Sequence, residues 1–80
     1  MSTISLASTT VLKILWQNDI NDQDMFNHSK FLLFKKILKD RHLNVGVRKY
    51  IAPDRNIQYD IVFNSKEDHM LFMLHFGHLI

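Results

Sequence analysis

Apolar side chains alternate with polar ones in three segments of the chain, and this period of two is typical of half-buried β-strands. The segments are residues 10–17, 44–52 and 57–63. The alternating apolar residues are Leu12, Ile14 and Trp16 in the first segment, Val45, Val47 and Ile51 in the second, and Ile57, Tyr59, Ile61 and Phe63 in the third. Pro53 and the polar residues after it favour a type I turn between the last two segments. The sequence therefore predicts three strands, of which the second and third form a hairpin.

A helical period of 3.6 predicts a first helix from about residue 25 to about residue 41. Asn21 or Asp22 can cap its N-terminus through a side-chain oxygen. One arc of this helix is apolar, and we expect that arc to face the core. The opposite arc carries lysines with Leu32 among them. The core arc consists of Phe26, Phe31, Leu33, Phe34, Ile37 and Leu38, and the lysines are Lys35, Lys36 and Lys39.

A last helix is predicted between a capping box at Ser65 and a stop at Gly77. The Ser65 side chain can accept a hydrogen bond from the backbone N–H of Asp68, and Asp68 can reach back to Ser65. Gly77 takes a positive φ at low cost, which favours a helix end. One broad face of this helix is formed by Met70, Leu71, Met73 and Leu74. We expect that face to pack on the sheet, which leaves Phe72 and Phe76 on the far side for a partner.

The predicted element order is β-α-β-β-α, an α+β fold. A right-handed crossover through the first helix places strand three between strands one and two, so the antiparallel three-stranded sheet has the order 1-3-2. Both helices then lie on one face, as in a ferredoxin-like fold that lacks its fourth strand. Residues 10–80 form this single domain, and residues 1–9 are either an N-terminal arm or a short extra strand. The outer edge of strand one is expected to be open, and open edges invite pairing with another chain.

Composition limits the chemistry that the chain can perform. The 80 residues are 46% hydrophobic, which favours one folded domain, and the absence of cysteine excludes disulfides and thiolate chemistry. We find no signal peptide and no apolar run long enough for a membrane span, so we expect a cytoplasmic protein with no membrane partner. The five histidines lack metal-ligand spacing, and no phosphate loop or nucleophile motif occurs. We therefore expect a non-enzymatic protein with no cofactor, no metal and no small-molecule substrate.

Charge is distributed unevenly. Eight of the ten Lys and Arg residues lie in residues 30–55, although the formal net charge of the whole chain is only +2. This basic block makes nucleic-acid binding an alternative function, because lysines and arginines contact phosphates and Trp16 or Tyr50 could stack on bases. The candidate phosphate contacts are Lys35, Lys39, Arg41, Arg48, Lys49 and Arg55. Against it, the open face of the middle strand would show Gln58, Asp60 and Val62, with no aromatic residue and one acid.

The run from Tyr59 to Asp68, followed by Phe72 and then Phe76 and Gly77, resembles the closing strand and helix of small uncharacterised accessory proteins encoded by tailed bacteriophages. The resemblance implies a virus-encoded accessory or inhibitor protein that binds a host protein in the host cytoplasm, or a minor virion component. It defines no functional site, so no functional residue is carried over.

These patterns favour a small protein-binding module, acting either on another protein or as a homo-oligomer. Three features support this interpretation: the last helix is apolar on two sides, Leu32 lies among the lysines of the first helix, and the edge of the sheet is expected to be open. The expected partner-binding residues are Leu32, Lys35, Lys36, Lys39, Phe72 and Phe76.

Overall fold

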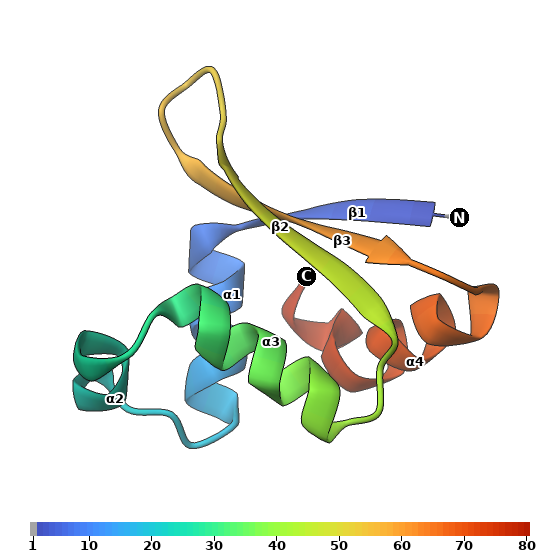
Figure 1. Cartoon of the computed structure of the whole chain (residues 1–80), viewed down its shortest axis with the longest axis horizontal. Helices are drawn as coiled ribbons and strands as arrows, with labels where there is room; N and C mark the ends of the chain where they lie inside the picture. Colours follow the sequence, from blue (N-terminus) through green and yellow to red (C-terminus); the bar gives the residue numbers. More distant parts are fainter. Residues whose placement is uncertain (1) are drawn as a thin grey trace.

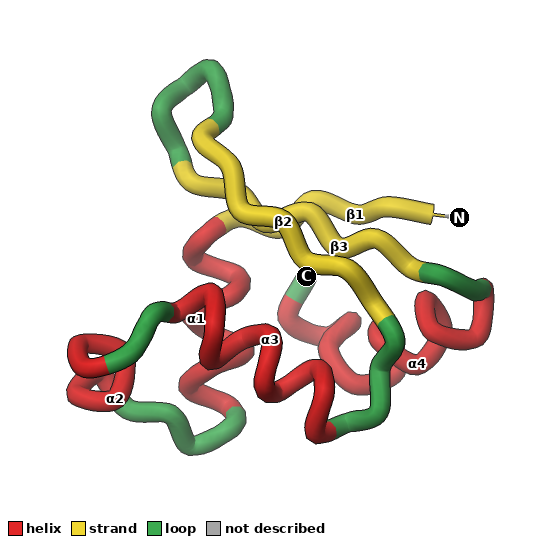
Figure 2. The backbone as a smooth tube through the Cα atoms, in the orientation of Figure 1, coloured by secondary structure: helices red, strands yellow, loops and turns green. Residues whose placement is uncertain are grey.

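The computed structural model describes residues 2–80, which fold into an antiparallel sheet with all of its helices on one face (Figure 1). The backbone trace in Figure 2 shows the same two layers, with the helical layer beneath the strands. The elements are β1 (Ser2–Ala7), α1 (Ser8–Gln17), α2 (Asp22–Asn27), α3 (Lys30–Asp40), β2 (Val45–Ile51), β3 (Ile57–Phe63), α4 (Lys66–Phe76) and the short 3-10 helix η1 (Gly77–Leu79). None of the helices in residues 2–80 has the length and apolar composition needed to cross a membrane.

The sheet has the order β1-β3-β2, and both outer strands are antiparallel to β3. The predicted α+β class and sheet order 1-3-2 are therefore confirmed, but the first strand is a different segment. Of the two alternatives for residues 1–9, the structure has the strand, with Ser2 opposite Phe63 and Ala7 opposite Gln58; residue 1 lies outside the described residues. Because β1 belongs to the sheet, the domain includes residues 2–7, which the prediction placed outside a domain that began at residue 10.

The predicted strand over residues 10–17 is wrong, because this segment belongs to α1. Val11, Ile14 and Leu15 are buried, and their spacing of three and four residues forms one stripe of a helix. Trp16, expected on the inner face of a strand, is instead 51% exposed. The segment is rich enough in apolar residues to satisfy both periods, and the place beside β3 is taken by β1.

The predicted helix over residues 25–41 is interrupted, and α2 and α3 are separate helices. His28 and Ser29 have extended backbone conformations, which break the helical phase between them. Phe26, expected in the core arc, is consequently 90% exposed on α2, whereas Phe34 is buried on α3. The N-terminal cap is as expected, since Asn21 accepts from the backbone N–H of Asp24 at 2.8 Å.

Helices α1 and α3 both end in a Schellman motif, with a non-glycine residue in the left-handed conformation. After α1, Asp19 has φ 63°, and the N–H of Ile20 donates to the carbonyl of Leu15 at 3.1 Å. After α3, His42 has φ 59°, and the N–H of Leu43 donates to the carbonyl of Leu38 at 3.0 Å. These ends satisfy helical carbonyls and turn the chain back towards the core.

The predicted hairpin is confirmed, with Ile51 opposite Ile57 at its end. Pro53 occupies the second position of a turn closed by the N–H of Arg55, which donates to the carbonyl of Ala52 at 2.8 Å. Figure 1 shows the hairpin extending beyond the helical layer, and Ile51 and Ile57 are 72% and 37% exposed.

The core lies between the inner face of the sheet and the helices. It is contributed by β1, β3, three helices and the segment after α3, and it contains Leu6, Val11, Ile14, Leu15, Phe34, Ile37, Leu38, Leu43, Tyr59, Ile61, Phe63, Phe72 and Phe76. Alternate residues of β3 supply its centre, in agreement with the predicted inner face of that strand.

Candidate protein-binding surface

Helix α4 begins and ends close to where the sequence predicts, although its last turn differs. The Ser65 side chain accepts from the backbone N–H of Asp68 at 3.1 Å, and the Ser65 hydroxyl donates to the Asp68 carboxylate at 2.9 Å. The predicted return bond from Asp68 to the backbone N–H of Ser65 is thus replaced by a side-chain bond. Gly77 has φ −58°, so the expected positive φ is wrong, and the chain continues directly into η1.

Aromatic packing sets the rotation of α4 about its axis. The ring of Phe72 lies 5.4 Å from that of Phe63 on β3 and 5.2 Å from that of Phe76, while the His69 ring stacks on Phe63 at 4.5 Å. Edge and stacked contacts of this kind stabilise a pair beyond the area they bury. These rings fill the space beneath β3 and turn the opposite side of α4 outward.

The expectation that Phe72 and Phe76 contact a partner is wrong. Both side chains are buried, with exposed fractions of 0% and 1%. The expectation that the Met and Leu residues pack on the sheet is wrong for the same reason. Since α4 is apolar nearly all round, its periodicity leaves both rotations open, and the larger planar rings occupy the space under β3.

The exposed side of α4 is a continuous apolar surface, which we call the Met-Leu face and define as Met70, Leu71, Met73 and Leu74. Leu74 is 78% exposed and Met70 is 71% exposed, and the other two are about 40% exposed. A shallow hollow of about 560 Å³ lies on this face, and it is lined by Lys66, His69, Met70, Met73 and Leu74. Sequence reasoning assigned these four residues to the side that packs on the sheet, although their crowding on one helix indicated an excess of apolar surface.

One flank of α4 is polar and is joined to α3. Arg41, the residue after α3, donates from Nη1 to Nδ1 of His75 at 3.0 Å and from Nη2 to Oδ1 of Asn18 at 2.8 Å. Its guanidinium group also lies 5.2 Å from the ring centre of Phe76. Arg41 therefore ties α1, α3 and α4 together, which is a structural role for a residue assigned to the alternative phosphate-binding set.

The expected contact residues on α3 share its outer side. Leu32 is 61% exposed, and Lys35, Lys36 and Lys39 are exposed around it; we call these four residues the Leu32-lysine face. Two open grooves meet at Leu32: one of about 800 Å³ runs towards α2, and one of about 470 Å³ runs towards β2. The prediction that these four side chains share one exposed surface agrees with their positions in the structure.

The alternative nucleic-acid set is dispersed over several surfaces. Lys35 and Lys39 lie on α3, and Arg41 faces α4. Arg48 points to the outer face of the sheet, and Lys49, opposite Tyr59, is on the inner side of β2. Arg55 is at the hairpin turn, where it has φ 68°. The structure does not gather these six residues into one patch.

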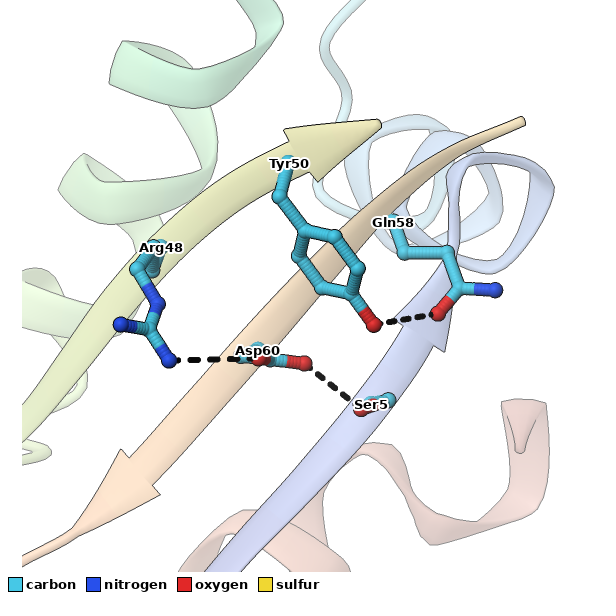
Figure 3. Close-up of polar contacts among 5 residues, drawn as sticks. All are labelled: Ser5, Arg48, Tyr50, Gln58 and Asp60. Atoms are coloured by element: carbon cyan, nitrogen blue, oxygen red, sulfur yellow. Dashed lines mark hydrogen bonds and ion pairs between the residues drawn. The ribbon is translucent and has the colours of Figure 1, made fainter. Parts of the chain in front are cut away.

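The outer face of the sheet carries short polar contacts between neighbouring strands (Figure 3). Ser5 on β1 donates to Asp60 on β3 at 2.6 Å, and Arg48 on β2 lies 3.7 Å from the same carboxylate. In the adjacent row, the Tyr50 hydroxyl donates to Gln58 at 2.7 Å. These side chains satisfy one another across the strands, and the centre of this face has an acid where a base-stacking aromatic would be needed.

Histidines and serines form no arrangement typical of catalysis or metal binding. Ser2 Oγ lies 3.1 Å from Nδ1 of His69, but that imidazole stacks on Phe63, and no carboxylate is paired with it. Within residues 2–80, no cluster of three His, Asp or Glu side chains is positioned to hold a metal ion.

Comparison of the chain with protein-family models, with curated proteins and with solved structures gives no match. The candidate site is therefore defined by its own geometry, in which the Met-Leu face of α4 is the largest group of adjacent exposed apolar side chains.

Proposed function

We propose that the chain is a small non-enzymatic protein-binding module and that the Met-Leu face of α4 is its contact surface. The observation that supports this is the exposure of four neighbouring apolar side chains on a helix whose other side is firmly packed. Large apolar patches on small proteins usually mark interaction sites. The proposal includes a ferredoxin-like classification of the fold. It also includes, as the partner, either a host protein, which the resemblance to phage accessory proteins implies, or a second copy of the chain.

The apolar side chains of this face supply part of the free energy that specific binding needs. Burying a Leu or Met side chain completely is worth about 1.5–3 kcal/mol, so the two most exposed residues, Met70 and Leu74, supply several kcal/mol together. Part of that gain offsets the lost freedom of the two partners. A few well-packed residues near the centre of a contact commonly dominate its affinity.

A paired substitution tests the proposal. Met70→Glu with Leu74→Glu places two charges on the Met-Leu face without disturbing the buried rings, and Phe26→Glu is a matched control because Phe26 is also exposed, on α2. We expect the unmodified chain and the control to show the same association, either with themselves by sedimentation or with a purified binding protein by calorimetry. The double variant should lose it while retaining its melting temperature. Equal association by all three chains would contradict the assignment of this face.

Nucleic-acid binding through the Leu32-lysine face is the second candidate. The observation in its favour is that, among the described residues, none of Lys35, Lys36 and Lys39 forms an ion pair, so their charges are available to phosphates. Electrophoretic mobility shifts with single-stranded RNA and duplex DNA test it, because phosphate binding weakens steeply with salt. Lack of any shift at low salt would remove this candidate.

A further inference from the structure

We infer that the partner of the Met-Leu face is a second copy of this chain, joined through the free edge of β1 to form one continuous six-stranded sheet. This inference rests on the proposed protein-binding function and specifies its partner. The two copies are related by a two-fold axis beside β1, which runs antiparallel to β1 of the second copy. The helical layers of both copies then lie on the same side of the sheet, and the Met73 side of each Met-Leu face is turned towards the axis.

The two edges of the sheet differ in how they are protected. β1 and β2 are both terminal strands, and among the described strands β1 pairs with β3 alone. β2 carries the adjacent charges Arg48 and Lys49, and Lys49 points to the inner side. Charged side chains on an edge, especially inward-pointing ones, block the addition of another strand. β1 has six residues with no charge and no proline, so it is the edge that can accept a strand.

The side chains of β1 are compatible with pairing to themselves. Ser2, Ile4 and Leu6 face the helices, and Thr3, Ser5 and Ala7 face outward. In an antiparallel pair, directly opposed residues share a face. A two-fold axis that places Ile4 opposite Leu6 of the second copy therefore pairs apolar residues with each other on the inner face and Ser5 with Ser5 on the outer face. Because β1 has no charge, no like charges oppose one another.

The position of α4 connects this edge with the Met-Leu face. Ser2, the first residue of β1, contacts His69, so the first turn of α4 lies beneath the start of β1. The flank of α4 that carries His75 is joined to Arg41 at the end of α3, and α3 packs beneath β2. At 100° per residue, Met73 lies on the flank opposite His75. With the strand order β1-β3-β2, that flank is on the side of β1, where a second copy would add.

The combined surface approaches the area that a stable dimer needs. The exposed parts of the four Met-Leu side chains amount to an apolar area on the order of 400 Å², a typical size for a functional patch, and the part on the Met73 side faces the second copy. The strand edge and the half-buried Ile4 extend this surface towards the roughly 800 Å² per partner of a standard interface. In a two-fold dimer the same patch of each copy meets its counterpart, so the second copy brings both its β1 edge and its Met-Leu face to the contact.

Sedimentation velocity over a range of concentrations tests the dimer with two edge variants. Thr3→Lys with Ala7→Lys charges the free edge at two exposed residues, and Gly46→Lys is the matched control on β2. At Gly46 a Cβ would meet only Val62 Cβ, at an ordinary 3.8 Å, so this lysine is tolerated. We expect a concentration-dependent dimer for the unmodified chain and for the control, and a dissociation constant raised at least about tenfold by the double lysine variant.

Hydrogen exchange of the unmodified chain tests the same contact without substitutions. We expect the β1 amide hydrogens that point away from β3 to exchange more slowly at high protein concentration than at low concentration. A monomer at about 1 mM, or a dimer that the β1 lysines leave intact, would overturn the inference. A monomer that binds another protein through Met70 and Leu74 would overturn only the second copy as partner. A monomer that binds no protein would overturn the proposed function as well.

Discussion

Replacing Phe72 by alanine should remove a large part of the stability of the domain. Phe72 is fully buried and contacts the rings of Phe63 and Phe76 at 5.4 and 5.2 Å. Truncation of a buried phenylalanine costs about 3–5 kcal/mol, because the lost transfer energy is joined by the cost of the cavity. For 80 residues the total free energy of unfolding is about 4–12 kcal/mol. We therefore expect Phe72→Ala to be close to the limit of folding.

The matched control is Leu74→Ala on the other side of the same helix. Leu74 is 78% exposed, so the substitution removes little buried area, and alanine is a good helix former. We expect its free energy of unfolding to change by less than about 0.5 kcal/mol. Both substitutions shorten an apolar side chain on the same helix, so a difference between their free energies of unfolding reports which side of α4 is buried.

Urea unfolding followed by circular dichroism gives both free energies in one series. Phe72→Ala should move the transition midpoint to much lower urea, and its melting temperature should fall by roughly 15 °C or more. The reverse ranking, with Leu74→Ala costing more than Phe72→Ala, would refute the rotation described above. It would mean that the Met-Leu face packs on the sheet and that the phenylalanines are exposed.

Three further predictions follow from the turns, the core and the basic surface. His42→Gly should stabilise the domain by about 1 kcal/mol and raise its melting temperature by several degrees, because the left-handed conformation costs a non-glycine residue about that much; an unchanged or lower melting temperature would contradict this account of the end of α3. Burial raises the pKa of Tyr59 above its ordinary value of 10.0, so folding favours its protonated form. This contribution to the free energy of unfolding is complete below pH 10 and is lost as the pH rises through the pKa of folded Tyr59. Ultraviolet titration should therefore show Tyr59 ionising at a higher pH in the folded protein than in the unfolded protein. Tyr59→Phe should reduce the loss of stability at alkaline pH. Finally, if the Leu32-lysine face binds nucleic acid, Lys35→Glu with Lys39→Glu should abolish the low-salt mobility shift, whereas Met70→Glu with Leu74→Glu should leave it unchanged.

The hairpin was predictable because several local signals agree there. Every second residue of β3 from Ile57 to Phe63 is apolar, and Pro53 fixes the position of the turn. The start of α4 was equally clear from Ser65 and Asp68, whose cap requires only residues close in sequence. Signals of this kind depend on residues close in sequence, so they are little affected by the tertiary contacts of the rest of the chain.

The first strand was misplaced because residues 10–17 satisfy both a strand and a helix pattern. What decides between them is distant: residues 2–7 pair with β3, and α1 then has to cover the inner face with Val11, Ile14 and Leu15. A similar ambiguity hid the break between α2 and α3, since His28 and Ser29 carry no strong helix-breaking signal. Tertiary context overrides weak local preference in such segments.

The candidate surface was only partly predictable from sequence. The exposure of Leu32 and its neighbouring lysines followed from an amphipathic pattern, which fixes the outer side of α3. On α4 the pattern has no such asymmetry, and aromatic shape rather than hydrophobicity selects the buried side. Sequence alone could show that α4 has excess apolar surface, but not which side carries it.

The pairing of β1 with β3 has a consequence for how the molecule folds. Ser5 and Asp60 are bonded partners 55 residues apart in sequence, whereas β2 and β3 are adjacent strands of one hairpin. Closing so long a loop costs entropy before any contact repays it, so we expect the hairpin and its helices to form early and β1 to dock late. Until β1 arrives, the inner strand β3 has an open edge. During that interval a neighbouring molecule's β1 competes for the same place, which makes strand exchange between copies the characteristic misfolding risk of this topology.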